Sequence, residues 1–485
     1  MRGIGSYGVY VPRGRLSRRA MVDANRWFNS GLGGLAKGER AYCNWDEDSV
    51  TMAVEAAARA VRGNPQAPTK LWFASTSLPF QDRQNAGIVS AAIGLDESVS
   101  TQDFSGSARA ATSALVAALS DGRPGDALLV GAENRQARAG SQDELLFGDA
   151  AAAVVLTDQV PVAEVLAVQQ RSVDFVDHYR GAGRDYDYGW EERWIRDEGY
   201  MKIFPPVVMA ALKAAGITAG EIQHAVIPAP TQLLADTVGK KLGLGEGVVL
   251  PVLQGTVGFA GSAHPLLLLA AALDRASPGD IILLTGFGQG CDALVLRATP
   301  ALAAMAGRPA LEAALVGGRT DTNYQRYLAF NDLIEQERGL RAELDTQTPP
   351  SVLYRNRRML YGFFGGKCER CGTVQFPKAS ICVNPNCHAH HSQTDIRFAE
   401  IPATLQSFTA DNLTYCPDPP ARYGMVRFEG AGCLMMDIAD AVDGEVAVGK
   451  ALTMAFRIKL ADERRGFKRY FWKAKNAIQG RGAAA

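Results

Sequence analysis

The first three hundred residues contain an internal repeat, which limits the folds that the chain can adopt. Residues 117–129, AALSDGRPGDALL, resemble residues 271–283, AALDRASPGDIIL, at an offset of 154 positions. Each copy reads as alternating helices and short apolar strands with a Gly/Ser-rich turn before one helix, which is typical of α/β layers. Two copies with so long a period are too few for a solenoid. They predict one five-layered, pseudo-twofold domain with halves over 1–157 and 158–298.

The rest of the chain differs in character from the repeat. We expect a helical linker over 299–350, a compact cysteine-containing unit over 351–395 and a small β-barrel over 396–478. The barrel is expected because short alternating strands follow one another at regular spacing. A flexible tail is expected over 479–485. Several domains are consistent with a length of 485 residues.

Charge and hydropathy exclude several classes of protein. Lys and Arg total 51, as do Asp and Glu, so the chain lacks the basic excess of a nucleic-acid or anionic-membrane binder. The N-terminus has no signal-peptide pattern, and no uncharged apolar stretch reaches about 18 residues. We therefore expect a cytoplasmic protein with no membrane partner. Eight cysteines are too few for a disulfide scaffold of this length.

Four of the cysteines fall within twenty residues, in two close pairs. The pairs are Cys368 with Cys371 and Cys382 with Cys387. Two such pairs favour one tetrahedral zinc ion with four thiolate ligands. Because four thiolates leave no open position, we interpret the zinc as structural. Three histidines follow directly as alternatives to the last thiolate: His388, His390 and His391.

Several motifs, in this order, resemble those of the thiolase superfamily. They are DFSGSARAATSAL, GAEN, LFGDAAAAVVL, GKKLGL, GFAGSAHP and GFGQG. Over roughly 1–298 the chain is most similar to the branch of 3-ketoacyl-carrier-protein synthase III and hydroxymethylglutaryl-CoA synthase. Over roughly 352–478 it resembles the zinc-ribbon and OB-fold proteins that accompany acyl-CoA thiolase-like enzymes. The resemblance implies a five-layered thiolase fold, a rubredoxin-like zinc ribbon, an OB-fold barrel, a CoA thioester substrate and a homodimer through residues 101–106.

The chain departs from this superfamily at the residues that carry its chemistry. The nucleophilic cysteine of the family falls at Ala108, and a methyl group cannot attack a thioester. Other family residues are also replaced: the histidine falls at Ala229 or Pro230, the asparagine at Val257 or Gly258, and the synthase glutamate near Thr76. Two other nucleophiles remain open, Ser107, which lacks an adjacent base, and Cys291, which also reads as a small buried residue. The sequence therefore argues against an acyl-cysteine.

The resemblance implies that one part of the family site, the oxyanion hole, is retained, because this part consists of backbone groups. By position, the N–H groups of Ala108 and Gln289 would form an oxyanion hole that stabilises the enolate of an acyl-CoA. Aldol and retro-aldol reactions of a β-hydroxyacyl-CoA need such an enolate but no acyl-enzyme. Steroid side-chain-cleaving aldolases resemble this situation. We expect an enzyme of this lyase type.

Candidate side chains for this reaction remain open at the level of sequence. His264 is the first candidate for the base, with a packed helix-start histidine as the alternative. Tyr200 is the second, with Lys202 as an activating cation and simple packing as the alternative. Six further residues are candidates for substrate binding: Asp82, Arg83, Ser107, Arg109, His178 and Tyr179. A surface ion pair is the alternative for the first two.

Two other functions stay open. The chain would be an acyltransferase component if a separate cysteine-containing thiolase supplied the nucleophile, as in the phloroglucinol acyltransferase complexes that it resembles. Alternatively, residues 457–475 hold eight basic and two acidic residues with four interleaved aromatic rings, which is typical of a single-strand nucleic-acid surface. Attraction of CoA phosphates, or docking, is the interpretation that we favour for this segment, and nucleic acid is not the expected partner.

Overall fold

The computed structural model describes residues 2–62, 64, 66–305, 309–344, 346–347, 349–442 and 444–477. The chain divides into two compact units. The first comprises residues 1–43, 48–87 and 98–334, and the second comprises 44–47, 88–97 and 335–485. The expected tail over 479–485, and the last residue of the expected barrel, lie outside the described residues.

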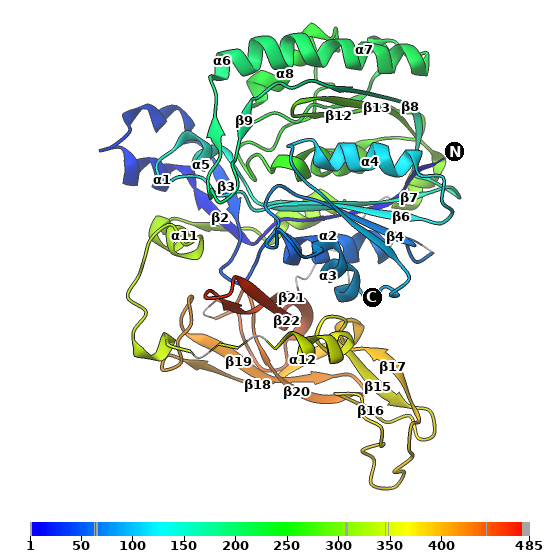
Figure 1. Ribbon diagram of the computed structural model, residues 1–485, viewed down its shortest axis with the longest axis vertical. Helices are drawn as coiled ribbons and strands as arrows, with labels where there is room; N and C mark the ends of the chain where they lie inside the picture. Colours follow the sequence, from blue (N-terminus) through cyan, green and yellow to red (C-terminus); the bar gives the residue numbers. More distant parts are fainter. Residues whose placement is uncertain are drawn as a thin grey trace. The chain divides into compact units, whose positions relative to one another are not determined.

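A nine-stranded mixed sheet with the order β11-β12-β13-β8-β1-β7-β6-β4-β5 organises the first unit (Figure 1). The bounds are β1 Gly3–Tyr10, β4 Lys70–Ala74, β5 Ser100–Phe104, β6 Ala127–Glu133, β7 Ala150–Thr157, β8 Ala163–Ser172, β11 His224–Val226, β12 Ile281–Phe287 and β13 Gly290–Ala298. A short β1–β8 pairing joins the two halves of the sheet. Strand β5, which contains most of the residues expected at the dimer contact, is an edge strand of this sheet, and the homodimer stays a prediction.

Five layers arise because helices cover and separate the two halves of the sheet (Figure 1). The helices are α2 Ser49–Arg62, α4 Ala110–Ser120, α7 Phe204–Ala215, α8 Gln232–Lys241 and α9 His264–Arg275, whereas the residues of α3 Asn85–Ala92 are divided between the two units. The outer helix α2 packs on β1, β6 and β7. The other outer helix, α7, packs on β8 and β13. The central helices α4 and α9 touch each other and strands of both halves. The expected thiolase architecture is confirmed.

The internal repeat coincides with equivalent elements of the two halves. Helices α4 and α9 begin at Ala110 and His264, and strands β6 and β12 begin at Ala127 and Ile281, so both pairs keep the sequence offset of 154. In each half the helix leads into an antiparallel pair, β6–β7 or β12–β13. The first strand of each pair also has a parallel neighbour, β4 or β11. The repeat predicted from sequence is therefore a structural duplication.

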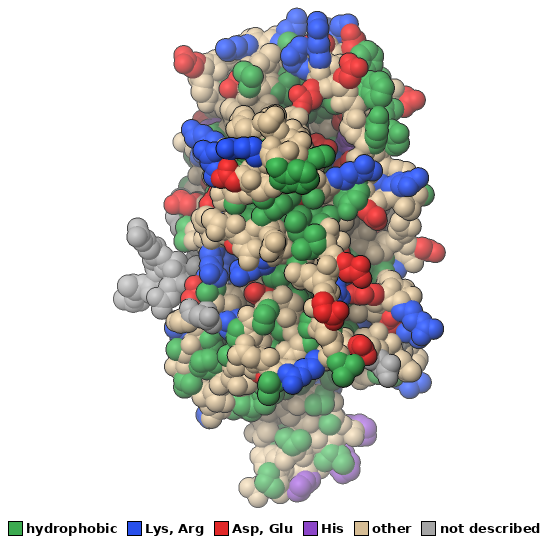
Figure 2. Space-filling model, turned by 90° about the vertical axis from the view of Figure 1, so that its left-hand side faces the viewer, with side chains coloured by type: hydrophobic (Ala, Val, Ile, Leu, Met, Phe, Trp, Pro, Cys, Tyr) green, Lys and Arg blue, Asp and Glu red, His purple; other side chains and the backbone are tan. Residues whose placement is uncertain are grey.

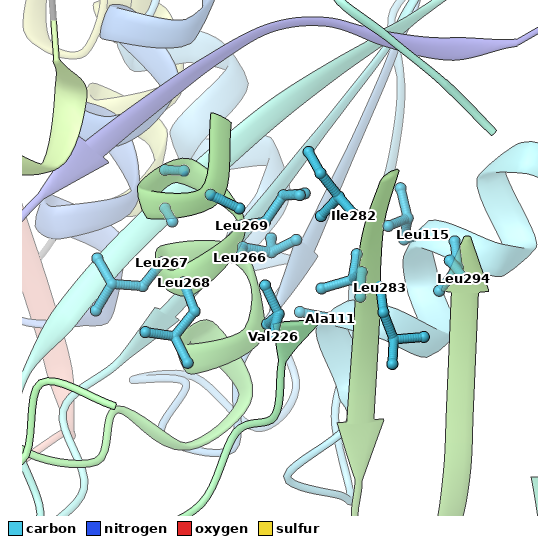
Figure 3. Close-up of a cluster of buried hydrophobic side chains, with 14 of the residues drawn as sticks. Ala111, Leu115, Val226, Leu266, Leu267, Leu268, Leu269, Ile282, Leu283 and Leu294 are labelled. Atoms are coloured by element: carbon cyan, nitrogen blue, oxygen red, sulfur yellow. The ribbon is translucent and has the colours of Figure 1, made fainter. Parts of the chain in front are cut away.

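Helix α9 lies in the core of the first unit because its sequence, HPLLLLAAALDR, is apolar on every side. Pro265 stands in its first turn, where the missing N–H leaves no helical hydrogen bond unmade. Figure 3 shows its leucines among side chains of β11, β12, β13 and α4. No helix in the described part of the chain is both long and apolar enough to cross a bilayer.

Smaller elements complete the first unit. Strands β2 Gly14–Ser17, β3 Glu39–Tyr42 and β14 Arg319–Asp321 form a three-stranded sheet, and β9 His178–Tyr179 pairs with β10 Tyr188–Gly189. The remaining helices are α1 Arg18–Asn25, α5 Gln142–Leu146, α6 Glu192–Trp194, a π-helical segment Ile195–Ile203, α10 Ala310–Val316 and α11 Tyr324–Phe330, with short 3₁₀ helices at Ser30–Leu35, Ala219–Glu221, Gly261–Ala263 and Pro300–Met305. Residues 98–334, which include β14 and α11, belong to this unit.

The second unit contains two antiparallel sheets. The order β16-β15-β17 joins Val374–Gln375, Phe364–Cys368 and Gln393–Arg397, after helices α12 Pro350–Arg355 and α13 Arg357–Leu360. The order β20-β19-β18-β21-β22 joins Gly432–Asp437, Ala421–Phe428, Ala403–Asp411, Ala451–Asp462 and Phe467–Asn476. An isolated β-bridge between Ile438, just after β20, and Ala474 of β22 connects the two ends of this five-stranded sheet. The described strands thus form a five-stranded sheet rather than a closed barrel, and the OB-fold barrel stays a prediction.

Candidate functional site

The two central helices of the first unit begin close together at the end of β6. A Cβ atom on Gly131 of β6 would lie 3.1 Å from the Cα of Ala263 and 3.4 Å from the Cβ of Ala111. Ala263 directly precedes α9, and Ala111 lies in the first turn of α4. The start of a helix offers unpaired N–H groups and the positive end of its dipole. This end of β6 therefore favours negative charge.

A turn at residues 288–290 lies against the start of α4. Its φ angles are +153° at Gly288, +53° at Gln289 and +125° at Gly290. A Cβ atom on Gly288 would lie 2.7 Å from Ser107 Oγ and 3.2 Å from Ala108 N, so only glycine fits here. Within the described part of the chain, neither the Ala108 nor the Gln289 N–H donates a hydrogen bond. The structure brings together the two segments expected to form an oxyanion hole.

Arg109 holds this turn in place. Its Nε donates to the carbonyl of Gly288 at 2.8 Å, its Nη1 to Asp292 Oδ1 at 2.7 Å and its Nη2 to Ser172 Oγ at 3.0 Å. Asp292 is completely buried and accepts further hydrogen bonds from Thr112, Ser113 and Gln170. Because its nitrogens are occupied, Arg109 is not the substrate ligand that the sequence suggested. Sequence analysis missed Asp292, whose only signal is an acid within an apolar strand.

Glu133, at the end of β6, is a second buried carboxylate that sequence analysis missed. It accepts hydrogen bonds from Ser262 Oγ at 2.6 Å, from Ser77 Oγ at 2.7 Å and from Thr76 N at 2.8 Å. Thr76 is the position at which the resemblance places the missing synthase glutamate. A carboxylate therefore adjoins this position, but it comes from another strand. The acid of GAEN, at the end of an apolar run, was the available signal.

The four cysteines expected to hold zinc converge in the second unit. All four Sγ atoms lie within 4.8 Å of one another, which suits a tetrahedral thiolate site. The turn between the first two is closed by a hydrogen bond from Gly372 N to Cys368 O at 2.8 Å. The nearby histidines are outside this cluster and exposed, and Figure 2 shows histidine side chains at the surface. The four thiolates alone therefore fit the predicted structural zinc.

Comparisons with known proteins agree with these geometries. Residues 212–297 match the family of 3-oxoacyl-[acyl-carrier-protein] synthase III C-terminal domains, and residues 355–391 match the rubredoxin-like zinc ribbon domain of ChsH2. The hydroxymethylglutaryl-CoA synthase of Thermococcus onnurineus is 30% identical over 298 residues, which cover 59% of this chain and 83% of the relative. The chain belongs to the hydroxymethylglutaryl-CoA synthase family. The synthase of Methanocella arvoryzae is 31% identical over 304 residues, with 59% and 85% covered.

Solved structures of the superfamily share the fold of the first unit. A 3-oxoacyl-[acyl-carrier-protein] synthase III from Aquifex aeolicus matches with a TM-score of 0.54 at 22% identity, over 61% of this chain and all of that one. PksG, an HMG-CoA synthase from Bacillus subtilis, matches with a TM-score of 0.59 at 17% identity, over 68% and 89%. The resemblance noted in the sequence is confirmed. The assignment of Ala108 to the nucleophile position of this family stays a prediction.

The structure contradicts His264 as the base of this family member. Its imidazole is completely buried, and its Nδ1 accepts the N–H of Ala260 at 3.3 Å. Burial lowers the pKa of His264 to about 3. A ring with this pKa is neutral near pH 7 but is too weak a base to take a proton there. His264 is a packed helix-start residue, the alternative considered above.

We expect this buried histidine to reduce stability in mild acid. Its pKa is about 3 when folded, against an ordinary value of 6.5, so the unfolded chain binds more protons between these values. Its full contribution to stability is present above the unfolded pKa and falls by up to about 1.4 kcal/mol for each pH unit below it. Urea unfolding of the wild type and His264→Gln between about pH 7 and pH 5 should show a shallower acid loss in the variant. Equal slopes, or the same change in exposed His390→Gln, would contradict this.

Tyr200 is also not the base. Its hydroxyl donates to the carbonyl of Pro228 at 3.1 Å, and its ring centroid lies 4.2 Å from that of Phe287. Burial raises the pKa of Tyr200 far above its ordinary value, because the phenolate would lose its water. Lys202, expected to activate it, pairs with Glu198 at 2.5 Å instead. Tyr200 packs beside the turn, as its alternative interpretation held.

The two open nucleophiles are likewise occupied or buried. Ser107 Oγ donates to the carbonyl of Gly288 at 2.8 Å, so it helps to hold the 288–290 turn rather than facing substrate. Cys291 is completely buried, and burial raises the pKa of its thiol well above the ordinary range. A thiol attacks as its thiolate, which this environment disfavours. The family nucleophile therefore has no substitute in either residue.

The remaining candidates for substrate binding lie on two surface segments. Asp82 is exposed, and the guanidinium of Arg83 lies 4.5 Å from the ring centroid of Phe80. His178 Nδ1 lies 3.2 Å from Asp177 Oδ2. Tyr179 is more than half exposed. None of these contacts joins the 288–290 turn, so the binding role of these residues stays a prediction.

The aromatic segment 457–475 belongs to the core of the second unit. Tyr470 and Trp472 are buried, and Trp472 stacks on Phe363 at 6.1 Å with an interplanar angle of 13°. Arg457 is also buried, with its Nη2 2.7 Å from Asp440 Oδ2. Single-strand binding needs exposed rings and cations. This arrangement argues against the nucleic-acid alternative, and Arg457 is equally withdrawn from CoA phosphates.

Proposed function

We propose that the chain is an enzyme that makes or breaks a C–C bond beside a CoA thioester without forming an acyl-cysteine. The observation that carries this proposal is the 288–290 turn against the start of α4, with Ala108 at the family's nucleophile position. Both N–H groups needed for an oxyanion hole are backbone groups, so the loss of the cysteine side chain leaves them in place. The names of the relatives support CoA thioesters as the substrate class.

The reaction that uses this site most simply is retro-aldol cleavage of a β-hydroxyacyl-CoA. A base takes the proton of the β-hydroxyl group, the Cα–Cβ bond breaks, and its electron pair passes to the thioester oxygen as an enolate. The N–H groups of Ala108 and Gln289 stabilise that oxygen. The enolate then takes a proton at Cα and leaves as a shortened acyl-CoA. The other product is an aldehyde or a ketone, and the aldol addition is the reverse.

The retro-aldol reaction needs a side chain that accepts the hydroxyl proton, and the candidate side chains do not fit this role. Their unsuitability favours a second candidate function. His264 and Tyr200 are unsuited to the role, and Glu133 already accepts hydrogen bonds from Thr76, Ser77 and Ser262. These donors occupy lone pairs that a base would use. The alternative is that the chain is a nucleophile-less subunit of an acyltransferase complex. A separate cysteine-containing thiolase would then supply the missing groups.

Removing one backbone donor tests the proposal most directly. Ala108→Pro deletes the N–H, and Ala108 precedes the N-cap Arg109 of α4, so the helical hydrogen bonds of α4 are not removed. We expect turnover to fall about 10²- to 10³-fold, the usual loss for one oxyanion donor. Ala108→Ser keeps the N–H and is the matched control. Mass spectrometry would follow CoA products and intact protein mass over a panel of β-hydroxyacyl-CoA and β-ketoacyl-CoA thioesters.

The same assay separates the two functions. Release of a shortened acyl-CoA with an aldehyde or ketone, without a protein adduct, supports the cysteine-independent lyase. Turnover only after addition of a cysteine-containing thiolase supports the subunit alternative. If Ala108→Pro and Ala108→Ser were equally active, the oxyanion role of this backbone would be wrong.

A further inference from the structure

The segment that follows β8 forms a hollow of about 330 Å³, which we call the aromatic hollow. Its wall contains Phe175, Tyr179, Tyr188, Trp190 and Trp194. The last four are between 44% and 56% exposed. In Figure 1, β9 and α6 of this segment lie on the left-hand side, which faces the viewer in Figure 2, where apolar side chains reach the surface. Clustered exposed rings of this kind mark binding surfaces.

Four rings of the aromatic hollow hold one another in position, as two pairs. Tyr179 and Tyr188 are paired across the β9–β10 hairpin, with ring centroids 5.5 Å apart. Trp194 stacks on Phe175 at 5.5 Å with an interplanar angle of 20°. Rings fixed by their neighbours lose little conformational entropy when a ligand binds. The hollow is therefore formed in advance, and its volume falls within the usual range for small-molecule sites.

The aromatic hollow adjoins the 288–290 turn. Val173 N donates to the carbonyl of Gln289 at 3.1 Å, two residues before the hollow's Phe175. The ring centroid of Phe175 lies 6.2 Å from that of Phe287, which directly precedes the turn. Gly199 fits against both rings, since a Cβ atom there would lie 2.7 Å from Phe287 Cζ and 2.9 Å from Phe175 Cε1. One layer of side chains thus links the hollow to the turn.

We infer that the aromatic hollow binds the acyl part of the thioester, and that this acyl group is apolar and carries a ring. This inference rests on the function proposed above. Flat rings stack favourably on aromatic side chains beyond the gain from buried area. The charged side chain of the lining is the acidic Asp174, which would repel an acyl carboxylate. The wall therefore selects ring-bearing acyl groups over acetyl and over dicarboxylic acyl groups.

Binding of three probes to the full chain tests this inference: phenylacetyl-CoA, acetyl-CoA and free CoA. Isothermal titration should show phenylacetyl-CoA binding about tenfold more tightly than acetyl-CoA, because only its ring fills the hollow. The Trp190→Ala/Trp194→Ala variant should bring the two affinities within about twofold while leaving free CoA unchanged. Val160→Ala, an exposed apolar residue in the β7–β8 connection, is the matched control. Tyr188→Ala serves if the double variant does not fold.

The outcomes separate this inference from the function on which it rests. If the wild type binds phenylacetyl-CoA and acetyl-CoA equally, the acyl assignment is wrong although the CoA function stands. If the tryptophan variant weakens all three probes alike, the hollow does not read the acyl group, and the inference is again overturned. If the variant changes the oligomeric state and no affinity, the hollow is an interface between copies. Failure of all three probes to bind the wild type would overturn the CoA function itself.

Discussion

Replacing Cys382 by serine should release the zinc ion and unfold the zinc ribbon over residues 364–397. Cys382 is buried, and its Sγ lies 3.5 Å from that of Cys371. The ribbon's strands have only five, two and five residues, too few to hold the fold by packing. Structural zinc supplies about 10–16 kcal/mol in small domains at neutral pH, so its loss exceeds the stability of such a ribbon.

Metal analysis and limited proteolysis would measure this effect. We expect the wild type to hold zinc and to resist cleavage between residues 369 and 392, and the Cys382→Ser variant to lose both properties. Cys433→Ser, which changes an exposed cysteine outside the cluster, should do neither. If the variant keeps its zinc and only its His390→Gln derivative loses it, a histidine replaces the thiolate and the four-cysteine assignment is wrong.

Replacing Arg109 by methionine should destabilise the first unit by about 3–5 kcal/mol, the usual result when one partner of a buried ion pair is removed. The variant leaves the carboxylate of Asp292 in a site with no solvent exposure. Thr112, Ser113 and Gln170 still donate to it, so the loss should lie near the lower end. Denaturant unfolding measures the change. Hydrogen exchange of the 288–290 amides should rise beyond the global effect, because the turn loses its clamp.

Two further variants make this result specific. Arg123→Met removes an exposed arginine that pairs with Asp121 at 3.0 Å, and should cost at most about 1 kcal/mol. Adding Asp292→Asn to Arg109→Met removes the buried charge, so the double variant should be more stable than the sum of the single losses predicts. Simple additivity would show that the two residues are not coupled in the folded chain.

The sequence was sufficient to predict those features that depend only on the spacing of residues along the chain. The copies at 117–129 and 271–283 gave the pseudo-twofold fold because each half repeats its apolar periodicity in the same order. The zinc site was predictable because a short loop must bring Cys368 and Cys371 together. The expected loss of the family nucleophile at Ala108 rests on spacing in the same way and stays a prediction. None of these conclusions depends on how a distant side chain is oriented.

The side-chain roles failed where long-range burial decides them. His264 is polar in the sequence, yet packing with its Nδ1 on Ala260 N removes it from acid–base chemistry. Arg109 was ambiguous because its partner Asp292 lies 183 positions away. Glu133 and its donor Ser262 are 129 positions apart, so no local pattern joins them. Single acids in apolar strands need the fold before a role can be assigned to them.

The turn at 288–290 affects how the protein's function can be detected experimentally and which sequence changes it can tolerate. In the proposed site Gln289 would act through its backbone N–H, so its side chain could change to any residue that tolerates a φ of +53°. Substitutions at Ala108 or Gln289 that keep the N–H and the backbone conformation would leave such a site working, and an alanine scan would pass over it. Amide-to-ester replacement, which swaps a single N–H for oxygen, would detect it. Enzymes that rely on main-chain donors in this way conceal their machinery from motif searches.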